Sequence, residues 1–198
     1  MKITAAIVLS LVLSLSFGAR AADYIIDGKG VHSFVQFKTS HMGFGWVYGQ
    51  FLKFNGDFSY DPANDAANKI SMVVDATSLF TNNADRDGLL HLRSDKYLDT
   101  EEYPTASFTS TSYKTVGEKK AVVTGNLTLL GVTKQVSLDV DVLGGGKDPW
   151  GGYRQAFEAR TKLKTADFGM KAAQVFPELE LIVSIEGCKK PNPYCGTD

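Results

Sequence analysis

The sequence predicts an all-β protein, because most of the chain alternates between apolar and polar residues. A period of two is typical of strands with one buried face. Turn-forming clusters such as "DPAND", "GEKK" and "GGGKDPWGG" separate these segments at hairpin spacing, so the strands should be antiparallel. The alternating segments lie near residues 33–39, 54–60, 70–74, 106–110, 123–129, 136–142, 157–163 and 179–185. Such a set of strands forms either a sandwich or a closed barrel.

The composition of the inward-facing positions favours a barrel with a lined cavity over a solid core. Phe108, for example, shares its face with Ala106 and Ser110. Small residues among large ones leave space inside a barrel. An eight-stranded barrel has room for packed side chains or for one slender ligand.

One segment, near residues 83–93, predicts a short helix instead of a strand. Asn82 or Asn83 can cap it, and Asp85 and Asp87 fall in its first turn. Gly88 weakens the helix. We expect this excursion to lie over one end or one side of the barrel.

The two ends of the chain predict export. Residues 1–21 have the basic start, the apolar run and the small-residue cleavage site of a secretory signal peptide, which places the mature protein in the periplasm. Residues 22–187 are then one barrel domain, and residues 188–198 are a tail. In an oxidising compartment, a disulfide between Cys188 and Cys195 is expected in this tail.

Charge and motifs exclude several classes of function. Without Lys2 and Arg20, the mature chain has 19 basic and 22 acidic residues and no basic stripe, which disfavours a nucleic-acid partner. No nucleophile elbow, phosphate-binding loop or dinucleotide fingerprint is present in the sequence. His32 and His41 are nine residues apart, so an unbroken strand would place them on opposite faces, and we expect no metal site.

Several motifs, in their order along the chain, resemble the YceI-like family of exported polyisoprenoid-binding proteins. They are "HSFVQFKTSHMGFGWVYGQF", "FNGDFSYD", "RDGLLHLRSDKYLD", "YPTASFTST", "GNLTLLGVTKQVSLDV" and "DPWGGYRQAFEARTKLKTADFGM". The resemblance covers residues 23 to about 187. It implies an eight-stranded antiparallel, lipocalin-like barrel with a helical excursion. It also implies a bound long apolar lipid (a polyisoprenoid, an isoprenoid quinone or a fatty-acid amide) and no other cofactor.

The resemblance makes the inward-facing residues candidates for lipid binding. The candidates are Val35, Phe37, His41, Phe44, Trp46, Phe54, Phe58, Met72, Phe108, Leu127, Phe157 and Phe168. Filling a solid core is the alternative role for the aromatic residues. The "MGFGW" stretch at residues 42–46 is expected to be a mobile mouth loop or a tight turn.

Candidates for contact with the lipid head group are His41, Arg86, His91 and Arg93. The alternatives are a hydrogen-bonded structural role for His41 and a surface ion-pair set of Arg86, Asp87 and Arg93. The chain departs from the family pattern Arg-Asp-x-His-Leu by two extra residues before His91. At about 100° per helical residue, this turns His91 by about 200° relative to Arg86.

The function expected from these observations is that of a periplasmic lipid carrier, with no catalytic residue. It would contact a membrane surface transiently through the "SHMGFGW" stretch at residues 40–46. One alternative is a lipid-modifying enzyme that uses His41. Another is an accessory protein that holds quinone for a membrane cytochrome. A homodimer is compatible with the sequence.

Overall fold

The computed structural model describes residues 21–28, 32–89 and 91–192, and their strands form one antiparallel sheet. The strands are β1 Ala22–Ile26, β2 Phe34–His41, β3 Gly45–Phe51, β4 Phe54–Tyr60, β5 Lys69–Asp75, β6 Leu79–Phe80, β7 Thr105–Gly117, β8 Lys120–Leu129, β9 Val132–Lys147, β10 Tyr153–Lys164 and β11 Glu178–Lys189. The helices are α1 Ala84–Asp87 and three 3₁₀ turns, η1 Asp65–Ala67, η2 Ala76–Ser78 and η3 Thr165–Phe168.

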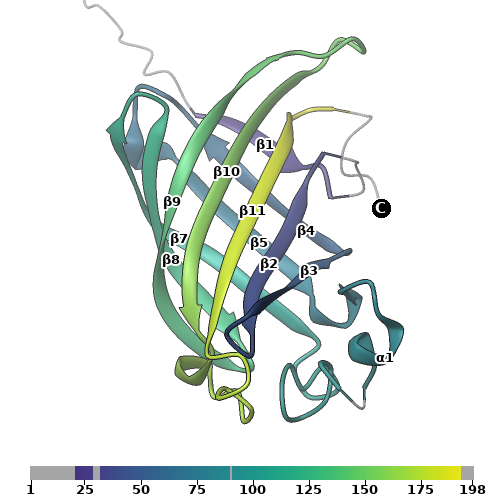
Figure 1. The fold of residues 1–198 in the computed structure, drawn as a ribbon. Coiled ribbons are helices and arrows are strands. Elements are labelled where there is room, and N and C mark those ends of the chain that lie inside the picture. The colour runs from purple at the N-terminus through teal and green to yellow at the C-terminus, as the bar shows by residue number, and fades with distance from the viewer. Residues whose placement is uncertain (1–20, 29–31, 90, 193–198) are drawn as a thin grey trace, which may run out of the picture.

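The sheet closes on itself, and three of its strands are interrupted (Figure 1). β11 pairs with β1 at Gly187–Lys189 and with β2 at Leu179–Ser184, so β1 and β2 follow each other along one neighbour. β3 and β4 likewise act as one interrupted strand, in which β3 pairs with β2 and β4 pairs with β1. β5 and β6 form the third interrupted strand, in which β5 pairs with β4 and β6 pairs with β3. When each interrupted pair is counted once, the barrel has eight strands, each bonded to its neighbours in sequence.

The closed sheet confirms the predicted eight-stranded antiparallel barrel. It excludes the sandwich, which the strand pattern alone had left open. The alternating segments all form strands, because their apolar face packs inside and their polar face meets water. The sequence interpretation missed β1, β3 and the two-residue β6. It also expected "MGFGW" to be a loop or a turn, and the structure forms a tight turn at residues 42–44 between β2 and β3.

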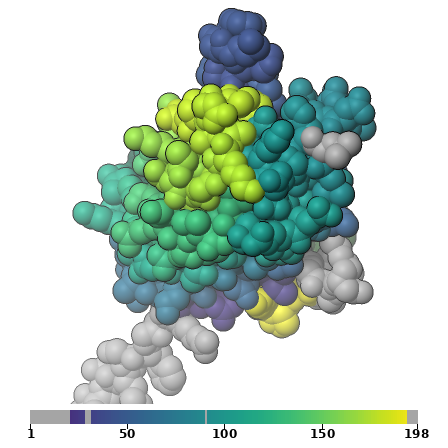
Figure 2. All heavy atoms as spheres, turned by 90° about the horizontal axis from the view of Figure 1, so that it is seen from below, coloured from purple at the N-terminus to yellow at the C-terminus, as the bar shows by residue number. Residues whose placement is uncertain are grey.

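The two ends of the barrel are built differently. The upper end of Figure 1 carries the start of β1, η1 and the connection between β9 and β10. At the lower end, residues 81–104 and residues 165–177 lie across the strand ends, and Figure 2 shows them covering most of this face. The two covers are joined, because the Ala172 N–H donates to the Lys96 carbonyl at 2.8 Å and Lys171 pairs with Asp95 at 2.9 Å.

The predicted helix is present but shorter than residues 83–93. Asn83 caps α1, and its side chain accepts the Arg86 N–H at 2.9 Å. Gly88 ends the helix in an extended conformation, as its low helix propensity favours. The chain then continues in turns toward β7.

The predicted signal peptide lies outside the described residues except for Ala21, and so does Cys195. Cys188 is fully buried and is not a free thiol, but its pairing with Cys195 stays a prediction. Within the described part of the chain, no helix has the length and apolar character needed to cross a membrane.

Candidate functional site

The barrel interior contains two cavities that follow each other between its ends. The upper cavity measures about 130 Å³ and the lower one about 120 Å³. Each is close to the roughly 150 Å³ engineered cavity that accepts benzene. Both cavities are lined by Val35, Val74, Ala106, Leu127 and Leu181. The two spaces therefore share one apolar wall at mid-height, which suits a thin chain better than a globular ligand.

Glycines in the wall let phenylalanine rings lie flat against it. Phe37 in β2 pairs with Gly49 in β3, and a Cβ on Gly49 would lie 2.3 Å from Phe37 Cζ. Phe108 in β7 packs on Gly125 in β8 in the same way, at 2.4 Å. Any larger residue would push these rings inward, so the two glycines keep the interior open.

Seven of the predicted ligand-binding residues line the cavities. They come from six different strands, and the strand period places each of them on the inner face. They are Val35, Phe37, Phe58, Met72, Phe108, Leu127 and Phe157.

Phe44 and Trp46 do not line either cavity. They are 81% and 60% exposed, at and beside the turn between β2 and β3. Trp46 pairs with Ser40 on the outer face, and the Lys38 ammonium lies 4.7 Å from the centre of its ring. The inward residue of this part of β3 is Val47, which lines the lower cavity. The two cavities end before they reach these two residues, so a role of Phe44 and Trp46 in ligand binding stays a prediction.

Three further candidates are also absent from the cavity walls described. Phe54 is half-buried and packs on the upper core, while Phe168 is buried in η3, beyond the end of β10. His41 lies at the exposed end of β2, and its ring is 6.2 Å from that of Phe44. By its strand parity His41 was expected to point inward or to lie at the rim, and the structure places it at the rim.

The other head-group candidates hold the lower cover in place. Arg86 Nε donates to Thr81 Oγ1 at 2.7 Å, and Asp87 accepts the Thr81 N–H at 2.9 Å. Arg93 Nη1 donates to the Thr77 carbonyl at 3.1 Å. The expected ion-pair set is thus replaced by hydrogen bonds to threonines that follow β5 and β6.

His91 is exposed and stacks on Tyr97, with ring centres 5.6 Å apart. Tyr97 lines the lower cavity together with Leu92 and Leu98 of the same cover. Among the residues described, none of the four head-group candidates lines a cavity.

Polar residues that sequence reasoning missed lie at the upper end of the upper cavity. They are Tyr60, Asn68, Lys69, Ser110 and Tyr113. Tyr60 shares the parity of Phe58, which was a sufficient signal. Tyr113 was hidden by a bulge between Ser110 and Ser112, which turns the later residues of β7 to the opposite face.

The two tyrosines at this end are polar but uncharged. Their ring centres lie 6.3 Å apart. Burial raises the pKa of Tyr113 far above its usual value, and the neighbouring Tyr60 raises it further by charge repulsion and by a hydrogen bond. Burial also raises the pKa of Tyr60. Both phenols therefore keep their protons at any pH at which the protein would work.

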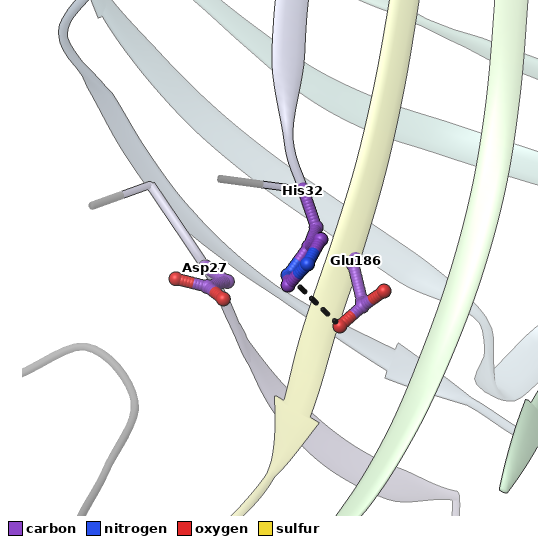
Figure 3. Close-up of side chains that lie close together, drawn as sticks. All are labelled: Asp27, His32 and Glu186. Atoms are coloured by element: carbon purple, nitrogen blue, oxygen red, sulfur yellow. Dashed lines mark ion pairs between the residues drawn. The ribbon is translucent and has the colours of Figure 1, made fainter. Parts of the chain in front are cut away.

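A separate charged cluster lies at the upper rim (Figure 3). Asp27, His32 and Glu186 have ligand atoms within 4.8 Å of one another, so they could hold a metal ion by geometry. However, Arg154 Nη1 lies 3.0 Å from Asp27 and 2.6 Å from Glu186. A cation would have to displace this guanidinium, so the cluster is better explained as structural. His32 is exposed at this rim, on the other side of its strand from Val35 and Phe37.

Comparisons with known proteins agree with this architecture. The sequence model of the YceI-like domain matches residues 24–187. The chain belongs to the YceI-like family. A UPF0312 protein of Photorhabdus laumondii is 49% identical over 183 residues, which are 91% of this chain and 93% of the relative. These findings confirm the resemblance on which the ligand-binding candidates were chosen.

Solved structures share the YceI-like barrel. The crystal structure of a Campylobacter jejuni YCEI protein is 28% identical with a TM-score of 0.68, over 76% of this chain and 90% of that one. A polyisoprenoid-binding domain from Saccharophagus degradans, implicated in plant cell wall breakdown, has a TM-score of 0.60 at 19% identity. It covers 87% of this chain and all of that chain. At this low identity, the second likeness shows the fold alone.

Proposed function

We propose that this YceI-like protein is a carrier that holds a long apolar lipid inside its barrel. The observation that carries the proposal is the pair of apolar cavities that share a wall at Val35, Leu127 and Leu181. A polyisoprenoid is one lipid of this shape, and the Saccharophagus degradans domain, which shares the fold alone, is described as binding one. Isoprenoid quinones and fatty-acid amides have the same long apolar tail.

The energetics favour exchange with a membrane over capture from water. Each buried methylene is worth about 0.8 kcal/mol against water, so a free long-chain lipid is far too unfavourable to be the starting state. The relevant equilibrium is between barrel and bilayer. Both environments are apolar, and the net difference is small, so polar contacts decide which lipid is selected.

We place the carrier in the periplasm, on the signal peptide predicted at residues 1–21. We also propose that the turn between β2 and β3 contacts the membrane. Met42, Phe44 and Trp46 are exposed there. Figure 2 shows this hairpin projecting away from the rest of the lower face. Exposed aromatic residues on a projecting turn suit the interface of a bilayer.

Native mass spectrometry of the protein purified from its own host, followed by lipid extraction, tests the carrier. The expected result is a mass above that of the processed chain and an extract that contains one class of long apolar lipid. A protein of bare mass that also takes up no lipid from liposomes would contradict the proposal.

The enzymatic alternative has no supporting geometry. His41 lies at the rim and its described ring contact is to Phe44, not to a group that would orient a base. A membrane cytochrome partner and a homodimer stay predictions.

A further inference from the structure

The lower cavity is closed by side chains that do not belong to the sheet. They are Leu92, Tyr97 and Leu98 from residues 81–104, and Met170 and Phe176 from residues 165–177. In the upper cavity, by contrast, every lining residue described except Asn68 lies in a strand. Ladder hydrogen bonds hold a strand on both sides, whereas a segment outside the sheet can open locally at a lower free energy. The lower end is therefore the end that can open while the barrel stays intact.

The upper end is held more firmly than the lower one. Tyr113, Tyr60 and Phe157, on three different strands, form a series of ring contacts with centres 6.3 and 5.0 Å apart. The η1 loop at this end is tied to β7, because the Asp65 carboxylate accepts the Thr115 N–H at 2.8 Å and the Thr115 hydroxyl at 2.7 Å. These contacts connect strands directly or fasten a loop to one.

Residues 165–177, called the flap below, form a loop that closes on its own base. The Thr165 N–H donates to the Pro177 carbonyl at 3.2 Å, and the buried Thr165 Oγ1 donates to the Phe176 carbonyl at 2.7 Å. Within the loop, the Met170 N–H donates to the Thr165 carbonyl at 3.3 Å. A compact loop whose ends lie together is an Ω-loop. Such a loop can move as one body about its base, because its internal bonds need not break.

Few polar contacts hold the flap to the cover at residues 81–104. In the described part of the chain they are the hydrogen bond from the Ala172 N–H to the Lys96 carbonyl, at 2.8 Å, and the ion pair of Lys171 with Asp95, at 2.9 Å. The two side chains of the ion pair are 63% and 62% exposed, and a pair this exposed contributes little to stability. The flap is thus fastened to its neighbour weakly enough to separate from it.

The flap borders both the lower cavity and the exposed β2–β3 hairpin. Its Phe176 ring contacts the Tyr97 ring of the other cover, with centres 5.6 Å apart, and both residues line the cavity. Glu178, directly after the flap, is bonded to the end of β2, because Thr39 Oγ1 donates to its carbonyl at 2.8 Å. Figure 2 shows the flap directly beside the projecting hairpin. A lipid that leaves a membrane at the hairpin would meet the flap first.

We propose that the flap is the gate of the barrel. It swings about Thr165 and Pro177, moves Phe176 away from Tyr97, and admits the lipid to the lower cavity from the side of the hairpin. When the flap closes, the two rings shield the apolar chain from water again. This inference rests on the carrier function proposed above and adds the route by which its ligand enters and leaves.

Cross-linking the flap tests the gate. In the double variant Asp95→Cys and Lys171→Cys, two exposed thiols replace the ion pair, so a short bifunctional maleimide can join them. Cys188 is not a free thiol and should not react. The probe is parinaric acid, a thin fatty acid whose fluorescence rises in an apolar environment. The linked, delipidated full chain is expected to lose uptake of the probe, while the same variant treated with N-ethylmaleimide takes it up like wild type.

The order of loading and linking separates a gate from a damaged site. Protein that is loaded first and linked afterwards should keep its probe when excess oleic acid is added, whereas the form treated with N-ethylmaleimide should exchange it. A second pair, Asp65→Cys and Thr115→Cys, links the upper end in the same way. This upper link should change neither uptake nor release.

The outcomes distinguish the gate from the carrier function. If the linked flap takes up and releases the probe as fast as its N-ethylmaleimide control, the carrier stands and the gate is wrong. Exchange blocked by the upper link alone has the same meaning. If wild type takes up neither parinaric acid nor any lipid from vesicles of its host's lipid extract, the carrier function itself fails, and the gate fails with it.

A milder variant decides if the double cysteine variant does not fold. Lys171→Ala removes the ion pair at the edge of the flap, so uptake and release of parinaric acid should both become faster while the amount bound at equilibrium stays the same. Lys162→Ala is the matched control, since it removes an exposed ion pair with Glu178 between two strands and should leave both rates unchanged. Equal rates in wild type and Lys171→Ala would then overturn the gate.

Discussion

Gly49 shows how a single residue controls the space inside this barrel. A Cβ at this position would meet the tip of the Phe37 ring at 2.3 Å and Thr81 Cγ2 at 2.9 Å. Both contacts are with side chains, so the backbone can stay in place while the ring moves. Since Phe37 lines the lower cavity, its movement would be inward.

We therefore expect Gly49→Ala to reduce lipid binding and to lower the free energy of unfolding by about 1–3 kcal/mol, the usual cost of overpacking. Urea denaturation and lipid uptake from liposomes measure the two effects. Gly146→Ala in β9 is the control, because its Cβ would meet nothing within 4 Å. Equal lipid uptake by wild type and Gly49→Ala would show that the Phe37 ring does not limit the interior.

Asp148 is a residue whose ionisation stabilises the fold. Burial alone would raise its pKa. However, the Gly152 N–H at 2.7 Å, the Arg154 guanidinium and the Trp150 N–H hold the pKa below its usual range. When the pKa of a carboxyl is lower in the folded state than in the unfolded state, its ionisation stabilises the fold. This stabilisation is complete at pH values above the unfolded-state pKa, which is about 3.9 for Asp. That contribution is lost as the pH falls through the folded-state pKa.

We expect Asp148→Asn to be less stable than wild type at pH 7 and to lose less stability between pH 5 and pH 2. Urea midpoints across this range measure the difference. Asp139→Asn, an exposed substitution on β9, should follow wild type. Parallel pH curves for wild type and Asp148→Asn would contradict the assigned role.

At the residue scale, prediction from the sequence succeeded where the strand period is regular and failed where it is not. The period of two placed Phe58, Phe108 and Phe157 in the cavity wall. It could not place Tyr113, because the bulge between Ser110 and Ser112 reverses the parity of the residues that follow it, up to a second register shift between Thr115 and Gly117. Asn68 gave no signal, since it follows a 3₁₀ turn where no strand pattern exists.

At the element scale, the hairpin of β2 and β3 is where the proposed exchange with a membrane can be tested against simple storage. Its turn begins with Met42 in the left-handed conformation and presents Phe44 and Trp46 to solvent. None of these three lines the described cavities. Their exposure is therefore not needed to hold a ligand.

We expect the double substitution Phe44→Asp and Trp46→Asp to slow lipid transfer from liposomes by roughly tenfold, because charged residues do not enter the interface. The amount of lipid bound at equilibrium should not change. Stopped-flow transfer and endpoint binding measure the two quantities. Trp150→Asp is the control, since Trp150 is also exposed but lies in the connection at the opposite end. Equal slowing by the control would point to a general charge effect.

The helical excursion shows why elements outside the sheet were harder to predict. The sequence indicated the cap, which is Asn83, and the weakening effect of Gly88, but it predicted a helix near residues 83–93 and the helix ends at Asp87. Its position was decided by tertiary contacts, in which Arg86 and Asp87 bind Thr81 and Leu92 enters the lower cavity wall. Those contacts engage the guanidinium of Arg86, a head-group candidate, in hydrogen bonds to Thr81.

At the scale of the whole molecule, the proposed carrier should be more stable when loaded. A ligand that binds only the folded barrel at one hundred times its dissociation constant adds about 2.7 kcal/mol to the free energy of unfolding. We expect delipidated protein to melt at a lower temperature than protein reloaded with hexadecanamide or a decyl-substituted benzoquinone. Differential scanning calorimetry measures this shift, with lysozyme plus the same lipid as a control. Identical melting of both forms would count against an internal site.

The sequence by itself determined the all-β class, the inward face of each regular strand and membership in the YceI-like family. These depend on a local period of two and on motifs in a fixed order, both of which are present in the chain before it folds. Only the tertiary structure decided where the interior ends and which polar groups it meets. Closure of the sheet brings β1 beside β11 and places Asn68, Tyr60 and Tyr113 around one cavity end, from segments up to 53 residues apart. Local patterns contain no information about such distant neighbours. The parity of a residue in a strand fixes the face of the sheet to which its side chain points, but not which residues it contacts on that side.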